Sequence, residues 1–248
     1  MSASLFPTLP PELICRVFEF ADDFSVVAAL AQTARIFYLT WREHPTSICQ
    51  AVAPRVFSNL TDAERLLDMQ EAAEAVTQSQ VGRKEKSIIR AKRLLSNARC
   101  ASAAADHWVD ICEIHKYFDR EDPRMRPSEL ARFEHAFYSV WTIGIMGTVP
   151  YLHDQASAFL DECSPRELCR LNELAQWAIY FNENEFGSSG LDFHDEIWKI
   201  GCDLASSRWM KVAYHDGRHA IAPPDGTPLK FFAFFDDTQK YLELISDE

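Results

Sequence analysis

Apolar residues recur every three or four positions along most of this chain, a spacing typical of helices that bury one face. The first such stripe consists of Leu13, Ile14, Val17, Phe18 and Ala21. Pro10 and Pro11 precede it, and they predict a helix start because proline fixes φ at a helical value. Two more short helices are predicted over 26–33 and 35–41, the first of them after capping side chains.

Helical spacing continues beyond residue 45. It predicts helices over 47–56 and 61–80, and around 130–141, 168–179 and 197–204. Asp216-Gly217 is typical of a type I′ turn and leaves open a small β-hairpin over 211–222. The apolar run 229–235 is interpreted as a buried strand or the start of a helix. We predict an all-α protein with an N-terminal three-helix module, 1–48, and an irregular helical domain, 49–248.

The charge balance and the cysteines narrow the class of protein. The chain has 25 Lys and Arg against 37 Asp and Glu, and this acidic balance opposes binding to nucleic acid or to an anionic membrane. No basic segment precedes an early apolar run, and no apolar run is long enough to cross a bilayer. The seven cysteines include no CxxC pair and indicate reduced thiols. We expect a cytoplasmic or nuclear protein that binds neither nucleic acid nor membrane.

The first 45 residues contain a motif. Its parts are Leu9-Pro10-x-Glu12-Leu13, Val17-Phe18, Leu30 and Arg35-x-Phe37. In this order and spacing they resemble the F-box, with a departure at Ala34, where that family commonly has cysteine, and a slightly longer loop after Ala21. The resemblance implies a module that binds the Skp-type adaptor of SCF ubiquitin ligases and, through it, a cullin. The remaining chain, which more loosely resembles fungal F-box-type proteins, would then hold an unknown protein substrate.

The resemblance also implies which side chains contact the adaptor. They are Leu9, Pro10, Leu13, Val17, Phe18, Leu30 and Phe37. Three short helices bury too little surface to enclose so many large apolar side chains, so some of this surface is expected to meet a partner. The alternative is that these side chains only pack on the C-terminal region.

A basic edge is the main charged feature. Residues 81–99 contain seven Lys and Arg against one Glu, and Lys86, Arg90 and Arg93 share one side of the predicted helix. The favoured interpretation is a solvated face paired with the protein's own carboxylates. The functional interpretation is a contact for an acidic or phosphorylated substrate segment, because clustered cations hold phosphate well.

Signals for catalysis, cofactors and metals are weak. Cys100, His107, Cys112 and His115 have the wrong spacing for a zinc site, and the chain has no P-loop, GxGxxG, GxSxG or HExxH motif. We therefore predict no catalytic residues, no cofactor and no metal. The predicted function is a substrate-recruiting F-box subunit. The alternatives are an adaptor-bound scaffold outside ubiquitination and a free-standing helical ligand-binding protein or enzyme.

Overall fold

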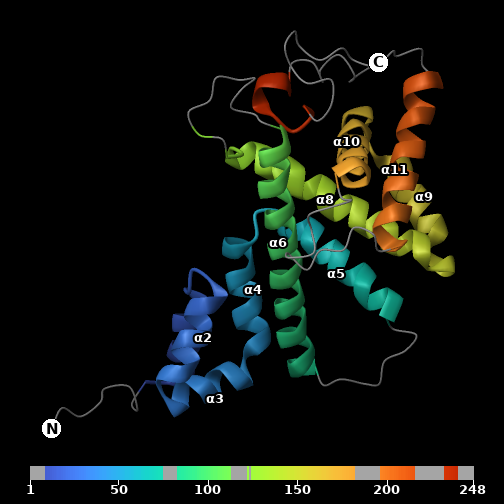
Figure 1. The fold of residues 1–248 in the computed structure, drawn as a ribbon. Helices are drawn as coiled ribbons and strands as arrows, with labels where there is room; N and C mark the ends of the chain where they lie inside the picture. Colours follow the sequence, from blue (N-terminus) through green and yellow to red (C-terminus); the bar gives the residue numbers. More distant parts are fainter. Residues whose placement is uncertain are drawn as a thin grey trace. The chain divides into compact units, whose positions relative to one another are not determined.

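The protein is all-α, as the sequence predicts (Figure 1). The computed structural model describes residues 9–74, 83–112, 122, 124–181, 196–215 and 232–239, and every regular element within these ranges is a helix. The chain divides into two compact units, Met1–Ala63 with Thr77–Asn97, and Glu64–Val76 with Ala98–Glu248. Each unit is described by itself.

The N-terminal unit contains the predicted run of short helices. They are α1 (Pro11–Glu19), α2 (Phe24–Thr33), α3 (Arg35–Glu43), α4 (Pro45–Val56) and the first half of α6 (Arg83–Cys112). The Asp23 carboxylate caps α2, since it accepts hydrogen bonds from the Ser25 and Val26 N–H groups at 2.7 and 2.9 Å. A side-chain oxygen before the first turn satisfies amide groups that have no partner within the helix. Asp23 is among the capping residues that the sequence offered, and the helix begins at Phe24, two residues before the predicted start.

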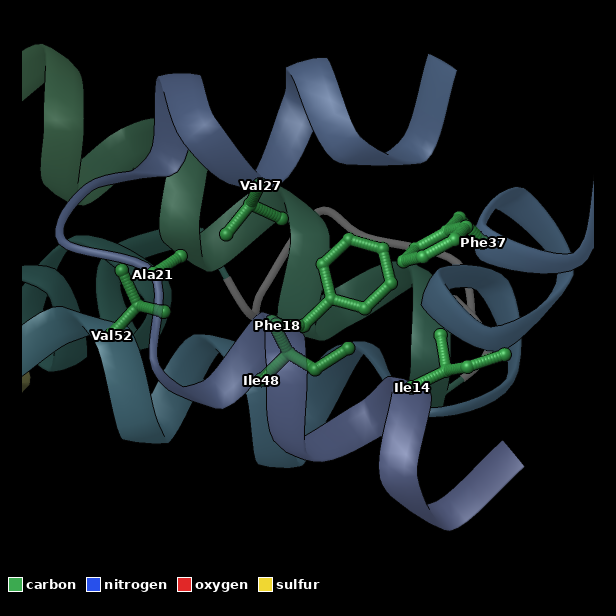
Figure 2. Packing of buried hydrophobic residues seen from close by; sticks show 7 residues of the cluster. All are labelled: Ile14, Phe18, Ala21, Val27, Phe37, Ile48 and Val52. Atoms are coloured by element: carbon green, nitrogen blue, oxygen red, sulfur yellow. The ribbon is translucent and has the colours of Figure 1, made fainter. Parts of the chain in front are cut away.

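One apolar core holds the N-terminal unit together. Figure 2 shows its buried members, which are Ile14, Phe18, Ala21, Val27, Phe37, Ile48 and Val52. The last two belong to α4, so this core extends past residue 48, where the sequence placed the end of the first module. Arg55, also on α4, donates hydrogen bonds to the backbone carbonyls of Ala21 and Glu19. It thereby satisfies carbonyl groups at the end of α1 that have no helical partner.

The C-terminal unit packs long helices around aromatic side chains. Its elements are α5 (Leu60–Glu74) from Glu64 on, α6 from Ala98 on, α8 (Pro127–Thr148), η2 (Pro150–Leu152), α9 (His153–Glu162), α10 (Pro165–Phe181), α11 (Glu196–His215) and η4 (Asp236–Thr238). The Trp108 ring lies 5.0 to 5.5 Å from the rings of Phe133, Trp177 and Phe234, measured between centroids. Such edge-on and tilted aromatic contacts add to the stabilisation from burial alone.

Two glycines let α8 and α11 approach closely. A Cβ atom on Gly144 would collide with the backbone carbonyl of Ile197, and one on Gly201 would collide with the carbonyl of Val140. Neither obstacle is a flexible side-chain end, so the contact requires glycine at both positions. This crossing fixes how the two helices meet.

The C-terminal segment corrects one sequence interpretation. Residues 211–214 lie in the last turns of α11, so the first strand of the predicted hairpin is wrong. The helix continues because the turn signal, Asp216-Gly217, comes only after it; residues 216–222 lie outside the described residues. Within the run 229–235, Phe232 to Phe235 are buried and lead into η4. Arg132 donates to the Phe234 carbonyl, and Glu173 accepts from the Ala233 N–H at 2.8 Å.

Candidate docking site on the N-terminal unit

Helix α1 has two apolar edges, of which one is buried in the core and the other is exposed to solvent. Ile14 and Phe18 are fully buried in the core, whereas Leu13, Val17 and Phe20 are 52%, 43% and 79% exposed. The exposed set follows i, i+4, i+7 spacing and therefore lies along one side of the helix. We call Leu13, Val17 and Phe20 the α1 ridge. A large apolar side chain that remains exposed is a candidate for contact with a partner.

The structure separates the seven predicted adaptor contacts into three groups. Pro10, Leu13 and Val17 are exposed, while Leu9 and Leu30 are half-buried and pack against the core. Phe18 and Phe37 are 0% and 4% exposed, and Figure 2 shows both among the core side chains. These two are corrected from contact residues to core residues, because their rings present almost no surface to a partner.

Five exposed large apolar residues of the same unit were not among the contacts predicted from the sequence. They are Phe20, Val26, Tyr38, Leu39 and Ile89. Phe20 had a usable signal, since it continues the spacing of Leu13 and Val17. Tyr38 and Leu39 directly follow the buried Phe37 on α3. The sequence alone did not show which of these three side chains faces the core.

Polar contacts hold the ends of α1 in place. Arg16 and Glu19 form an exposed ion pair at 2.9 Å, one turn apart on the helix. The Cys15 thiol lies 3.6 Å from both the Glu19 carboxylate and the Ser47 hydroxyl on α4. The Cys15–Ser47 contact and the hydrogen bonds of Arg55 at the carbonyl end join α1 to α4. The α1 ridge is therefore carried by a helix that is anchored from behind, and a preformed surface costs less conformational entropy to bind.

The predicted basic edge also lies in the N-terminal unit, on α6. Lys86 is exposed, and Arg90 and Arg93 are half-buried. All three already take part in interactions within the protein. Both interpretations of this edge, the solvated face and the contact for an acidic substrate, stay predictions.

The described cysteines are poorly suited to nucleophilic chemistry. Burial raises the pKa of Cys49 and Cys163 to about 11 and that of Cys202 to about 12, and it also raises the pKa of Cys15, Cys100 and Cys169. A thiol is reactive mainly as the thiolate, so a raised pKa lowers the share of the reactive form in these six groups near neutral pH. Among the described residues no group of three or more His, Cys, Asp and Glu side chains could hold a metal ion. Of the four residues whose spacing argued against a zinc site, His115 and the side chain of Cys112 lie outside the described part of the chain.

A cavity of about 310 Å³ lies in the C-terminal unit between α5, α8 and α9. Arg65 and Met69 on α5, Met146 on α8, and Phe159 and Glu162 on α9 are among its lining residues. The Arg65 guanidinium lies 5.4 Å from the centroid of the Phe159 ring, within the range of a cation–π contact.

The remaining observations bear on membranes and on relatives. None of the helices in the described ranges combines the length and the apolar character needed to cross a bilayer. Comparisons with protein-family models, curated proteins and solved structures found no match to this chain.

Proposed function

We propose that the N-terminal unit is an F-box that docks to a Skp-type adaptor, and that the protein is a substrate-recruiting subunit of an SCF-type ubiquitin ligase. The observation that carries the proposal is the α1 ridge. The nine-residue helix α1 buries Ile14 and Phe18 on one edge and keeps Leu13 and Val17 exposed on another, and its C-cap residue Phe20 extends the exposed edge. The exposed edge begins next to Pro10, inside the part of the motif that resembles the F-box.

The proposed contact is energetically reasonable. Burying apolar surface stabilises a complex by roughly 25 cal/mol per Å², and aromatic anchors such as Phe20 often dominate an interface. Val26 on α2 and Leu39 on α3 are also exposed, which gives the unit further apolar surface beyond α1. In this proposal Phe18 and Phe37 hold the helices in place, and the ridge makes the contact.

Co-expression with a Skp-type adaptor tests the docking. Size-exclusion chromatography of the wild-type chain should show a 1:1 complex, and the double substitution Leu13→Ala/Val17→Ala should remove it. Ile179→Ala is the matched control, because Ile179 is similarly exposed but lies on α10 of the other unit. A folded wild-type chain that elutes separately from the adaptor would contradict the proposal.

The ubiquitination role needs its own test, because a scaffold that only binds the adaptor would pass the first one. A subunit that recruits substrates brings a bound protein to the cullin, so its loss should slow the turnover of that protein. An adaptor-bound scaffold would leave turnover unchanged. A cytoplasmic or nuclear location, where such ligases act, is part of the same proposal.

A further inference from the structure

The cavity between α5, α8 and α9 has an apolar floor and a polar mouth. Met146 and Thr142 on α8 are buried, and Met69 is half-buried. Arg65, Gln155 and Glu162 are exposed at the mouth. Methionine side chains are flexible and polarisable, so a floor with two of them can adapt to different apolar groups.

The size of the cavity limits what it can hold. Its volume of about 310 Å³ is at the lower end of the range for small-molecule sites, and corresponds to roughly ten water molecules of liquid volume. This space suits one large apolar side chain better than a nucleotide or another extended cofactor. Water over an apolar floor makes few hydrogen bonds, so an apolar group that displaces it gains free energy.

The charge around the mouth of the cavity determines which residues are favoured on either side of the bound apolar side chain. From Glu64 to its end, α5 has four carboxylates against Arg65, and α9 has three carboxylates and neither Lys nor Arg. Asp161 of α9 pairs with Arg208 of α11 at 2.8 Å, so carboxylates remain in excess around the mouth. Glu162 itself lines the cavity. A surface of one sign attracts ligands of the opposite sign and repels like charges. An acidic segment would therefore be disfavoured at this position.

We propose that this cavity is an anchor pocket for a segment of a partner protein that has a large aliphatic side chain beside Lys or Arg. The apolar side chain enters over Met69 and Met146, and its basic neighbour lies against Glu162. The role of this segment as the recruited substrate rests on the proposed function; binding to the pocket does not. The proposal differs from the acidic-substrate prediction for the α6 edge in both place and charge.

Methyl NMR on the full chain labelled with [¹³C-methyl]methionine tests the pocket without any adaptor. The chain has 5 Met, and Met69 and Met146 line the cavity whereas Met210 is exposed on α11. The probe is acetyl-Gly-Lys-Leu-Arg-Gly-amide, for which a dissociation constant of about 1 mM is expected of a single anchor. The Met69 and Met146 signals, assigned with Met→Leu variants, should shift and saturate while Met210 stays fixed.

Two comparison peptides identify what is recognised. Replacing the peptide's Leu with Ser should weaken binding at least tenfold, since the anchor is lost. The acidic peptide acetyl-Gly-Glu-Leu-Glu-Gly-amide should also bind at least tenfold more weakly. Equal binding of either comparison peptide, or no shift of Met69 and Met146 with the basic probe, would overturn the proposal.

Variants on α9 show whether the effect is local. Glu162→Gln should weaken the basic peptide about threefold, the scale of an exposed ion pair. Asp154→Asn makes the same change of charge on the same helix, but Asp154 does not line the cavity. The affinity of this variant for the basic peptide should therefore match that of the wild type. Ala158→Trp, at an exposed lining position, should block the peptide. Equal effects of Glu162→Gln and Asp154→Asn would show general charge attraction and contradict the pocket.

Discussion

The rings of Phe18 and Phe37 meet edge to face inside the N-terminal unit, with centroids 5.8 Å apart and planes inclined by 69°. This contact joins α1 to α3 across the middle of the core. Both residues belong to the motif that resembles the F-box, so part of that motif specifies the fold of the unit. The part of the motif that stays exposed lies on the other edge of α1, at Leu13 and Val17.

Substitutions on the two edges of α1 should therefore separate stability from binding. Phe18→Ala removes a fully buried ring and should lower the free energy of unfolding by about 4 kcal/mol. Leu13→Ala removes an exposed side chain and should change it by less than about 0.5 kcal/mol. For adaptor affinity we expect Leu13→Ala to cost about 2 kcal/mol, as truncation of a central contact does.

Urea unfolding and adaptor titrations on the same protein preparations measure both quantities. We expect Phe18→Ala to change mainly the stability and Leu13→Ala to change mainly the affinity for the adaptor. Loss of stability from Leu13→Ala, with affinity unchanged, would instead place Leu13 in the fold and remove it from the docking surface.

Hydrophobic periodicity predicted the helices well, but it could not show which residues of the first apolar stripe are buried and which are exposed. Leu13, Ile14, Val17 and Phe18 are adjacent pairs at helical spacing, and either edge of such a wide stripe can face the core. The choice depends on α4, whose Ile48 and Val52 pack against the Ile14 and Phe18 edge. That contact joins residues more than thirty positions apart, and spacing within one helix carries no information about it.

The C-terminal pocket was invisible to sequence reasoning for the same reason. Its lining comes from three helices, and none of Arg65, Met146 and Phe159 belongs to a motif. Helix ends were easier, since proline and the capping side chains act locally. The end of α11 was missed because residues 211–214 suit a strand or a helix, and the turn signal Asp216-Gly217 follows only after the helix ends.

Alanine at the close crossing of α8 and α11 should be destabilising in a graded way. Gly144→Ala places a methyl group against the Ile197 carbonyl, and the backbone must move, so we expect a loss of about 2 kcal/mol in the free energy of unfolding. At Gly147 the added methyl meets the side chains of Ile200 and Leu204, which can shift. There the higher helix propensity of alanine offsets the cost, and the change should be near zero.

Urea unfolding followed by tryptophan fluorescence compares these two variants with wild type. Gly147→Ala serves as the matched control because it is the same substitution in the same helix, one turn along. If the two variants were equally stable, the close approach of α8 and α11 at Gly144 would be contradicted.

Glu173 should make stability fall as pH rises. Burial raises the pKa of this carboxyl group to about 8. The hydrogen bonds that it accepts from the Ala233 and Phe232 N–H groups, and the nearby positive charge of Arg170, lower the pKa but do not outweigh burial. The folded state therefore keeps a proton that the unfolded state releases near pH 4.5. This stabilisation is full below about pH 4.5 and is lost as pH rises through about 8, with a slope of at most about 1.4 kcal/mol per pH unit.

Glu173→Gln isolates this contribution, because an uncharged amide oxygen can still accept the Ala233 hydrogen bond. The difference in free energy of unfolding between the variant and wild type should move in favour of the variant between pH 5 and pH 8. A difference that stays constant over this range would show that Glu173 has the same proton occupancy in both states.

The basic edge of α6 gives the last prediction, which separates the two interpretations of its charge. If the edge recruits an acidic segment, Arg90→Glu/Arg93→Glu should abolish binding of a fluorescent peptide with two phosphoserines between glutamates, while adaptor binding stays intact. Clustered arginines bind phosphate by charge-assisted hydrogen bonds, and reversing two of them turns attraction into repulsion. If the edge only pairs with the protein's own carboxylates, the double variant should lose stability and the wild type should not bind the peptide.

Lys92→Glu supplies the control for overall charge. Lys92 is exposed on the same helix, between the two arginines in sequence, and successive helical residues point about 100° apart. A recruiting edge formed by Arg90 and Arg93 should therefore be less sensitive to Lys92→Glu than to either single arginine reversal, in fluorescence anisotropy at fixed ionic strength. Equal losses from all three single reversals would mean that the peptide responds to the general field of the helix, and that no specific contact exists at this edge.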